Sequence, residues 1–381
     1  MRMLVLGGGL QGSACAWDLL RTTDAEVTLA DARPETLPAL LDQDRGARLR
    51  VAKVDARDAG AVRALMEGHV AAMSALPYYL NGALARIAVD IGVHFADLGG
   101  NTAIVREQQQ LDARARERGV SIMPDCGLAP GMVNILAAEG IRRLDTVETV
   151  RCYVGGLPQH PQPPLNYTLV YSLEGVLDYY TAPSWILRDG RPVSVEALSE
   201  IETVHFPEPT GNLEAFHTAG GISTMPWDFE GRIPEMEYKT LRYPGHAEII
   251  KAIRELGLLD VAEVNVGGVT IRPRDLFVAL ADRKLRQPEV RDLVALRVVV
   301  TGTRGGRAST VSFSLLDRYD EQHGIGAMMR TTGYSLSITG QLQVAGHVRR
   351  PGVTTAYEGM PFDRYIEGLA ERGVIVHEAV T

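Results

Sequence analysis

The chain has 381 residues, long enough for two domains of ordinary size, and its hydrophobic (45%) and charged (23%) fractions are those of a globular protein. A net charge of −8 without a basic cluster excludes nucleic acid as an expected partner. No apolar run approaches ~20 residues, and three cysteines make neither a disulfide framework nor a zinc spacing, so we expect a cytoplasmic protein with no metal and no membrane span.

The first predicted elements are a strand, a glycine-rich turn and a helix. An apolar run over 3–6 precedes glycines in G-x-G-x-x-G order, and a helical apolar pattern follows over 14–20. Gly7 permits the tight turn, Gly9 lets the backbone approach a pyrophosphate, and Gly12 lets the helix pack against the strand. The helix N-terminus adds free N–H groups for phosphate. The predicted phosphate-binding residues are Gly7, Gly9, Leu10, Gln11 and Gly12.

The second strand supports this interpretation and indicates the cofactor. It covers 26–30 and ends in Asp31, nineteen residues past Gly12. A carboxylate there accepts hydrogen bonds from the adenosine ribose and repels a 2′-phosphate, which favours NAD over NADP. Arg33 either softens that preference or is a solvated loop charge. The alternative for the whole segment is a glycine-rich turn that binds nothing.

Strands and helices then alternate. We predict helices over 34–41, 61–67, 81–92 and 102–119, and strands over 49–54, 69–76, 93–98 and 120–123. This order predicts an α/β fold with a doubly wound, Rossmann-type parallel sheet. Residues that follow its strands are further candidates for cofactor binding: Asp55, Ala75, Leu76, Pro77, Asp97 and Gly99. Asp55 is expected near the adenine amino group; the alternative at this turn is a helix N-cap at Asp58.

A second domain follows a loop at 124–134, where two glycines and two prolines fall within eight residues and indicate a crevice loop. A helix is predicted over 132–143. Strands are then predicted over 149–154, 165–171, 264–271, 293–301 and 308–317, with a long connection at about 205–245. These alternating strands predict an α+β domain with a mixed or antiparallel sheet.

The end of the chain returns to a helical pattern over 328–344 and 361–371, followed by a strand or tail at 373–377. We expect this segment to fold back onto the first domain. The predicted domains are therefore 1–125, completed by about 328–381, and 126–327 for substrate binding, catalysis and dimerisation.

Three polar clusters stand out in the second domain, at 153–167, 214–226 and 238–248. The first is a proline-rich loop that is equally well a rigid turn. The second places hydroxyls beside paired glycines, as polar binding loops do. In the third, Arg242 offers a fork for a carboxylate, and Lys239 or His246 offers a proton carrier. The alternative for each of these side chains is a solvated charge on the protein surface.

Four motifs make the sequence similar to the saccharopine dehydrogenase-like family, and within it to the L-lysine 6-dehydrogenases. They are Asp-Cys-Gly-Leu-Ala-Pro-Gly-Met-Val-Asn at 125–134, Tyr-Val-Gly-Gly-Leu-Pro at 153–158, Gly-Gly-Ile-Ser-Thr at 220–224 and Thr-Leu-Arg-Tyr-Pro-Gly-His at 240–246. The resemblance covers essentially the whole chain. Saccharopine reductases carry Asp where this chain has Ala129, which argues for a smaller amine than saccharopine.

The resemblance implies NAD-dependent oxidation of the ε-amine of L-lysine to an imine, which hydrolyses to a semialdehyde and cyclises. The chemistry requires a base and an anchor for the distal amino-acid group. By residue chemistry, the catalytic candidates are Lys239, His246 and Asp125, and the substrate-binding candidates are Arg242, Glu174, Ser223, Thr224 and Tyr243. Arg242 would hold the carboxylate, and Glu174 or Asp125 an ammonium group.

Other functions remain open from the sequence. One is a reductase that joins an aldehyde and an amine, as in saccharopine or carboxynorspermidine synthesis. Another is a catalytically silent NAD-binding regulator, which has no need of the cluster at 238–248. We expect a small-molecule substrate and a homodimer or higher homo-oligomer, with no membrane partner.

Overall fold

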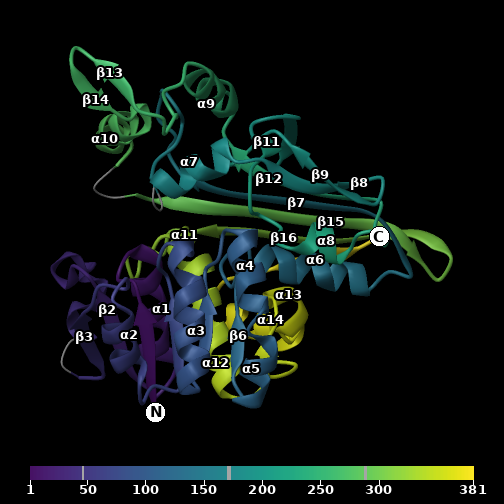
Figure 1. Ribbon diagram of the computed structural model, residues 1–381. Coiled ribbons are helices and arrows are strands. Elements are labelled where there is room, and N and C mark those ends of the chain that lie inside the picture. Colours follow the sequence, from purple (N-terminus) through teal and green to yellow (C-terminus); the bar gives the residue numbers. More distant parts are fainter. Residues whose placement is uncertain (45–46, 170–172, 287–289) are drawn as a thin grey trace.

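The computed structural model describes residues 1–44, 47–169, 173–286 and 290–381. Two sheets form two layers, one above the other in Figure 1, with helix α6 (Met132–Arg142) between them. One continuous apolar core includes side chains of both sheets and of α6, so the layers are packed together rather than tethered. Within the described residues, no helix has the length and apolar character needed to cross a membrane.

The first sheet is parallel, in the order β17-β6-β5-β4-β1-β2-β3. Its strands are β1 (Arg2–Leu6), β2 (Glu26–Asp31), β3 (Leu49–Lys53), β4 (Ala71–Ser74), β5 (His94–Asp97), β6 (Ser121–Met123) and β17 (Gly352–Val353). The strand order reverses between β1 and β4, which is where open parallel sheets bind ligands at the carboxyl ends of their strands. The predicted Rossmann-type sheet is confirmed.

The helices of this layer are α1 (Leu10–Thr22), α2 (Ala59–Met66), α3 (Asn81–Ile91), α4 (Thr102–Gln109) and α5 (Asp112–Glu117), with a 3₁₀ turn at Tyr78–Leu80. Two predicted helices are wrong in detail. The helix over 34–41 is two 3₁₀ turns, Pro34–Thr36 and Ala39–Asp44, because Leu37 before Pro38 is extended. The helix predicted over 102–119 is two helices. After Gln109 the backbone N–H groups bond to the carbonyl three residues back instead of four, which tightens the turn and ends α4.

The second sheet has the order β10-β11-β12-β7-β15-β16-β18, and β8 lies beside β12 and β9. Its strands are β7 (Thr146–Pro158), β8 (Ser184–Arg188), β9 (Arg191–Val195), β10 (Glu202–His205), β11 (Asn212–His217), β12 (Glu235–Arg242), β15 (Asp292–Arg304), β16 (Arg307–Arg318) and β18 (His377–Val380). Strand β12 runs parallel to β7 and antiparallel to β11, so the predicted mixed sheet is confirmed.

The helices that accompany this sheet are α7 (Leu173–Thr181), α8 (Met225–Asp228), α9 (His246–Glu255) and α10 (Pro273–Leu285). Three predictions are corrected here. The connection at 205–245 contains β11, α8 and β12. The strand predicted over 165–171 is irregular as far as residue 169, and Tyr171 lies outside the described residues. The strand over 264–271 is a hairpin of β13 (Val264–Val266) and β14 (Val269–Ile271), because Gly267 and Gly268 turn the chain with φ of 60° and 87°.

The last segment serves both layers. It forms α11 (Ala327–Met329), a π-helical turn at Arg330–Tyr334, α12 (Ser335–Val344), β17, α13 (Ala356–Gly359) and α14 (Phe362–Glu371). Strand β17 extends the parallel sheet beside β6, whereas β18 pairs with β16 of the second sheet. The chain therefore passes between the layers three times: after β6, after β16 and before β18.

Candidate functional site

The glycine loop between β1 and α1 has the packing expected of a phosphate cradle. A Cβ added at Gly12 would lie 1.8 Å from the carbonyl oxygen of Gly7, and one at Gly7 would lie 3.0 Å from that of Ala75. A Cβ at Gly9 would meet no atom within 4 Å. Gly7 and Gly12 are therefore glycines because the fold is tight there, and Gly9 because the space above it is kept for a ligand.

The start of α1 leaves polar groups for an anion to satisfy. Gly9 caps the helix without a side chain, so the first N–H groups point into the open space above Gly9. Both polar atoms of the Gln11 side chain are buried without a hydrogen-bond partner within the described part of the chain. A buried amide without a partner, next to a backbone loop that only glycine keeps open, suits the pyrophosphate of a dinucleotide.

Asp31 lies at the end of β2, beside this loop. Its carboxylate accepts hydrogen bonds from the backbone N–H groups of Gly8 (2.7 Å) and Arg33 (2.7 Å). Residues Ala75, Leu76 and Pro77 follow β4 on the other side of the loop, and the Ala75 N–H donates to Leu6. Asp55 is exposed and paired with Arg57, which lowers its pKa to about 2, and Asp58 caps α2 through the N–H of Ala61.

Asp97 lies at the carboxyl end of β5, the strand end at which it was predicted. Its carboxylate is buried and accepts hydrogen bonds from the Gln108 side chain (2.7 Å) and the Gly99 N–H (2.8 Å), with a longer contact from the Asp125 N–H (3.5 Å). Burial raises its pKa to about 6. Asp97 thus supports the loop that carries Gly99 and Asp125.

Asp125 is the centre of the group of polar residues at this edge of the sheet. One carboxylate oxygen accepts the Gly100 N–H (3.2 Å), and the other accepts the Ser223 hydroxyl from the second domain. Burial raises the pKa of Asp125 to about 7, with the Ser223 hydrogen bond lowering it and the charge of Asp97 raising it. Asp125 and Ser223 both have positive φ, 60° and 51°, a strained backbone that is common where function requires a fixed geometry.

Ser223 and Thr224 lie in the loop before α8, as the hydroxyl-and-glycine cluster predicted. The backbone carbonyl of Ser223 accepts a hydrogen bond from the Thr102 hydroxyl at 3.5 Å. Together with the bond from the Ser223 hydroxyl to Asp125, this gives the loop two contacts with the first domain. Thr224 is turned away from Asp125 and bonds the Tyr357 hydroxyl at 2.8 Å. Ser223 therefore joins the Asp125 group, and Thr224 fastens the loop to the C-terminal segment.

Tyr179, on the last turn of α7, is a functional candidate that only the structure reveals. A Cβ at Gly100 would lie 2.8 Å from the Tyr179 hydroxyl, which places this phenol against the loop that carries Gly99 and Gly100. The charge of Asp125 contributes to a raised pKa of Tyr179, after burial and Tyr238. No motif in the sequence marks Tyr179, because the contact forms only when the two domains pack together.

The interpretation of Lys239 as the base is corrected. Successive residues of a strand point to opposite faces of a sheet. On β12, Tyr238 belongs to the core shared with the first domain, so Lys239 faces the other way. There its ammonium pairs with Glu202 at 2.8 Å and lies 3.8 Å from Glu237. Lys239 cannot reach Asp125 through the sheet.

The interpretation of His246 as the proton carrier is corrected for a different reason. It is only 2% exposed, with its ring nitrogens 3.0 Å from the Leu165 carbonyl and 3.0 Å from the Tyr180 hydroxyl. Burial and the nearby Arg242 lower its pKa to about 3. A neutral, enclosed imidazole of this kind is a hydrogen-bonding link in the core, and it is a poor proton acceptor at neutral pH.

Arg242 lies on the same face of β12 as Tyr238, and its side chain is buried among residues of the second domain. Its guanidinium donates to the Tyr180 hydroxyl (3.1 Å) and to two backbone carbonyls, of Gly156 (3.4 Å) and Leu241 (2.9 Å), and lies 4.7 Å from the centre of the Tyr167 ring. The side chain is therefore held rigidly by the second domain.

Two further candidates lie outside the Asp125 group. Glu174 is exposed at the start of α7, five residues before Tyr179. The Tyr243 hydroxyl donates to the Pro158 carbonyl at 3.0 Å, and its ring packs against the core on the Lys239 face of the sheet. Tyr243 is thus a structural residue in this geometry.

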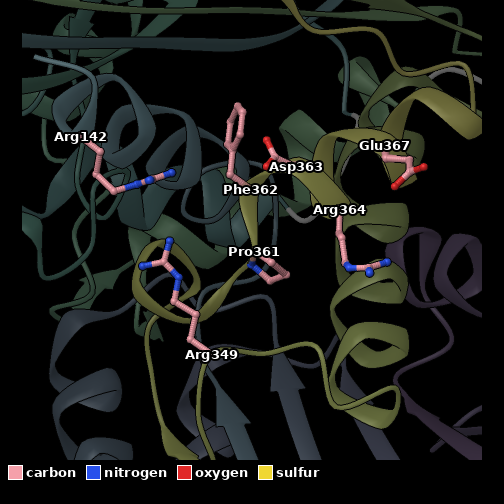
Figure 2. Close-up of a pocket in the computed structure, with 7 residues that line it drawn as sticks. All are labelled: Arg142, Arg349, Pro361, Phe362, Asp363, Arg364 and Glu367. Carbon is pink, nitrogen blue, oxygen red and sulfur yellow. The ribbon is translucent and has the colours of Figure 1, made fainter.

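The cavity between the end of α6 and the C-terminal segment is not part of the candidate site. A cavity of about 540 Å³ is lined by three arginines and two acidic residues on the C-terminal segment and the end of α6: Arg142, Arg349, Pro361, Phe362, Asp363, Arg364 and Glu367 (Figure 2). None of these residues belongs to the glycine loop or the Asp125 group. The candidate site is defined instead by close packing at the carboxyl edge of the parallel sheet.

Two family models match consecutive parts of the chain. The saccharopine dehydrogenase NADP binding domain matches residues 3–123, and the saccharopine dehydrogenase C-terminal domain matches residues 127–374. The boundary between them falls beside Asp125. Together the matches include the glycine loop, Tyr179, Ser223 and Arg242.

Curated relatives are distant and longer. Mitochondrial alpha-aminoadipic semialdehyde synthase of Mus musculus is 26% identical over 271 residues, which are 68% of this chain and 28% of that protein. Saccharopine dehydrogenase [NADP(+), L-glutamate-forming] of Saccharomyces cerevisiae is 25% identical over 268 residues, 68% of this chain and 58% of that protein. The chain thus spans less than two thirds of the length of either relative.

A solved structure shares the fold along the whole chain. Apo saccharopine dehydrogenase (L-Glu forming) from Saccharomyces cerevisiae superposes with a TM-score of 0.81, over 100% of this chain and 99% of that chain, at 19% identity. At that identity the likeness establishes the two-layer architecture and nothing finer.

Proposed function

Because the chain belongs to the saccharopine dehydrogenase family, we propose that it is an NAD-dependent oxidoreductase that oxidises the ε-amine of L-lysine. The observation that carries this proposal is the buried Asp125 carboxyl, with its pKa raised to about 7, on the same carboxyl edge of the sheet as the glycine loop. A carboxylate tuned to that range is a proton acceptor suited to neutral pH.

The proposed reaction balances in two stages. The substrate ammonium gives one proton to Asp125, and the carbon bearing the free amine then loses a hydride, which leaves an iminium. Water adds to that iminium and ammonium leaves, so R–CH₂–NH₃⁺, NAD⁺ and H₂O give R–CHO, NH₄⁺, NADH and H⁺. A bound nicotinamide dinucleotide supplies the hydride acceptor.

The protein's own residues have separate tasks in this scheme. The glycine loop and the start of α1 bind the pyrophosphate, and Asp31 binds the ribose. Asp125 takes the proton, and Ser223 holds the carboxylate by donating a hydrogen bond to it. Ala129 follows Asp125 in the same loop and puts a methyl group where saccharopine reductases carry Asp, which favours a primary amine over saccharopine.

We expect Asp31 to decide between the two dinucleotides. The matched domain is described as NADP binding, yet a carboxylate at Asp31 repels a 2′-phosphate. Asp31→Ser should lower the NAD/NADP ratio of kcat/KM by at least ~10-fold, about 1.4 kcal/mol. The control is Asp24→Ser, an exposed aspartate in the loop before β2. A ratio unchanged from that of the parent enzyme would remove Asp31 from this role.

We propose Arg242 as the anchor for the substrate carboxylate. Its guanidinium is held in place by Tyr180 and by two backbone carbonyls of the second domain, which suits a fixed fork. Arg242→Ala should reduce kcat/KM for lysine by the loss of a charge-assisted pair, on the order of 2–4 kcal/mol. The loss should be much smaller for cadaverine, which has no carboxylate, and Arg242→Lys should restore little.

The matched control for this prediction is Arg297→Ala. Arg297 also lies over an aromatic ring, that of Phe206, but on the opposite face of the same sheet. It should leave the preference for lysine over cadaverine intact. Equal losses for lysine and cadaverine in Arg242→Ala, or a lower Tm with normal lysine kinetics, would assign Arg242 to the structure of the domain.

A panel of substrates tests the proposal as a whole. Reduction of NAD and NADP is followed with lysine, ornithine, saccharopine and diamines. Preference for lysine supports the proposal, and preference for saccharopine supports the reductase alternative. A protein that binds the dinucleotide and oxidises no amine would instead be the silent regulator.

A further inference from the structure

The side chain of Tyr179 lies between two glycines from different domains. A Cβ at Gly100 would lie 2.8 Å from the Tyr179 hydroxyl, and a Cβ at Gly220 would lie 3.5 Å from a ring carbon of Tyr179 and 3.1 Å from the carbonyl oxygen of Gly100. Both glycines have positive φ, 108° and 82°. A side chain at Gly100 would press on the hydroxyl, whereas one at Gly220 would be in ordinary contact with the ring.

The backbone around Tyr179 fixes the ring in this place. The Tyr179 carbonyl accepts the Ala219 N–H at 3.2 Å, which ties the end of α7 to the loop that carries Ser223. The same loop reaches Asp125 through Ser223, so Tyr179 and Asp125 are held by one connected set of contacts. Burial, Tyr238 and Asp125 each raise the pKa of Tyr179, so the phenol keeps its proton at neutral pH.

We propose that the Tyr179 hydroxyl contacts the reacting nitrogen of the substrate opposite Asp125. This inference rests on the proposed function, and it assigns a catalytic residue to the second domain. The phenol oxygen accepts an N–H of the amine once Asp125 has removed the extra proton. The two N–H groups of the amine are then held by Tyr179 and Asp125. This fixes the orientation of the nitrogen, so that its lone pair is aligned with the C–H bond that breaks.

The first test is Tyr179→Phe, which removes only the hydroxyl. We expect kcat for the amine substrate to fall by about 10–100-fold, as for loss of an orienting hydrogen bond, with KM and dinucleotide affinity little changed. The rise of kcat/KM with pH through about 7 should persist, since Asp125 remains the base. The control is Tyr153→Phe, whose hydroxyl bonds Glu202 on the opposite face of the sheet and should leave kcat unchanged.

A second variant guards against a loss caused by poor folding. In Gly100→Ala the new methyl group would lie 2.8 Å from the hydroxyl and force it to shift, whereas the ring carbon that bears the hydroxyl is 3.8 Å away, an ordinary contact. Gly100→Ala should therefore lower kcat as Tyr179→Phe does, and the double variant should lose no more than either one. The backbone strain of alanine at this φ is measured separately by Tm.

The possible outcomes separate the two hypotheses. Full kcat in Tyr179→Phe, or multiplicative losses in the double variant, overturns the role of Tyr179 and leaves the proposed function standing. A parent enzyme that oxidises none of the amines overturns the proposed function, and the inference falls with it. A loss of kcat with unchanged KM, shared by the two single variants and not deepened in the double, is the result we expect.

Discussion

Replacing Asp125 by asparagine is expected to lower kcat for the amine substrate by about 10²–10⁴-fold, the range for loss of a positioned general base. Asparagine keeps the size of the side chain: its oxygen can accept the Gly100 N–H while its amide N–H donates to the Ser223 hydroxyl oxygen, so the fold should survive. It has no ionisable oxygen to take the substrate proton. Steady-state kinetics with lysine, alongside a melting curve, measure both effects.

The direction in which kcat/KM changes with pH follows from the protonation state of Asp125. Asp125 must be ionised to accept a proton, and burial raises its pKa to about 7. In the parent enzyme kcat/KM should therefore be low below pH 7, rise through about pH 7 and level off above it. Asp97→Asn removes a neighbouring negative charge, so it should move this rise to lower pH.

Asp292 offers a matched control. It is also a buried carboxylate with a pKa raised to about 6, but it accepts the N–H groups of Ala327 and Met328, away from the Asp125 group. Asp292→Asn should lower stability and leave the pH profile of kcat/KM in place. If Asp125→Asn retains the parent profile, another group is the base.

Substitution of Gly9 by valine should abolish measurable dinucleotide binding and leave a folded protein. Gly9 has φ −66°, which any residue adopts, and a Cβ there meets no protein atom within 4 Å. The branched side chain of valine would fill only the space in which a pyrophosphate approaches the backbone. Calorimetric titration with NAD and NADP, together with Tm, tests the two halves of the prediction.

Gly12→Val is the contrasting variant in the same loop. A Cβ at Gly12 would lie 1.8 Å from the Gly7 carbonyl oxygen, so the helix cannot pack against the strand without moving. This variant should lose stability as well as binding. Parent-level affinity for NAD in Gly9→Val would contradict the placement of the pyrophosphate, even if Gly12→Val behaves as expected.

The contrast between Lys239 and Arg242 shows what could be predicted from the sequence. The cofactor-binding half of the fold could be predicted from the sequence. Each glycine of the loop has a local structural reason, and strands alternate with helices along the chain. In the second domain, the segment 238–248 was treated as one cluster. Once 235–242 is known to be a strand, residues three apart must lie on opposite faces, so Lys239 and Arg242 could never serve one site.

Other features required the tertiary structure. Tyr179 approaches Gly100 only because α7 of one domain packs over the carboxyl edge of the other. His246 has the composition of a catalytic residue, but its burial beside Arg242 and Tyr180 makes it part of the core. Burial of that kind depends on neighbours distant in the chain, which a local pattern does not report.

The three passages of the chain between the layers, after β6, after β16 and before β18, set the mechanics of the molecule (Figure 1). A single protease cut in any one passage would leave two covalent ties, so a nicked molecule should migrate as one body under native conditions and separate into fragments only in denaturant. Two lobes joined at several places also resist sliding.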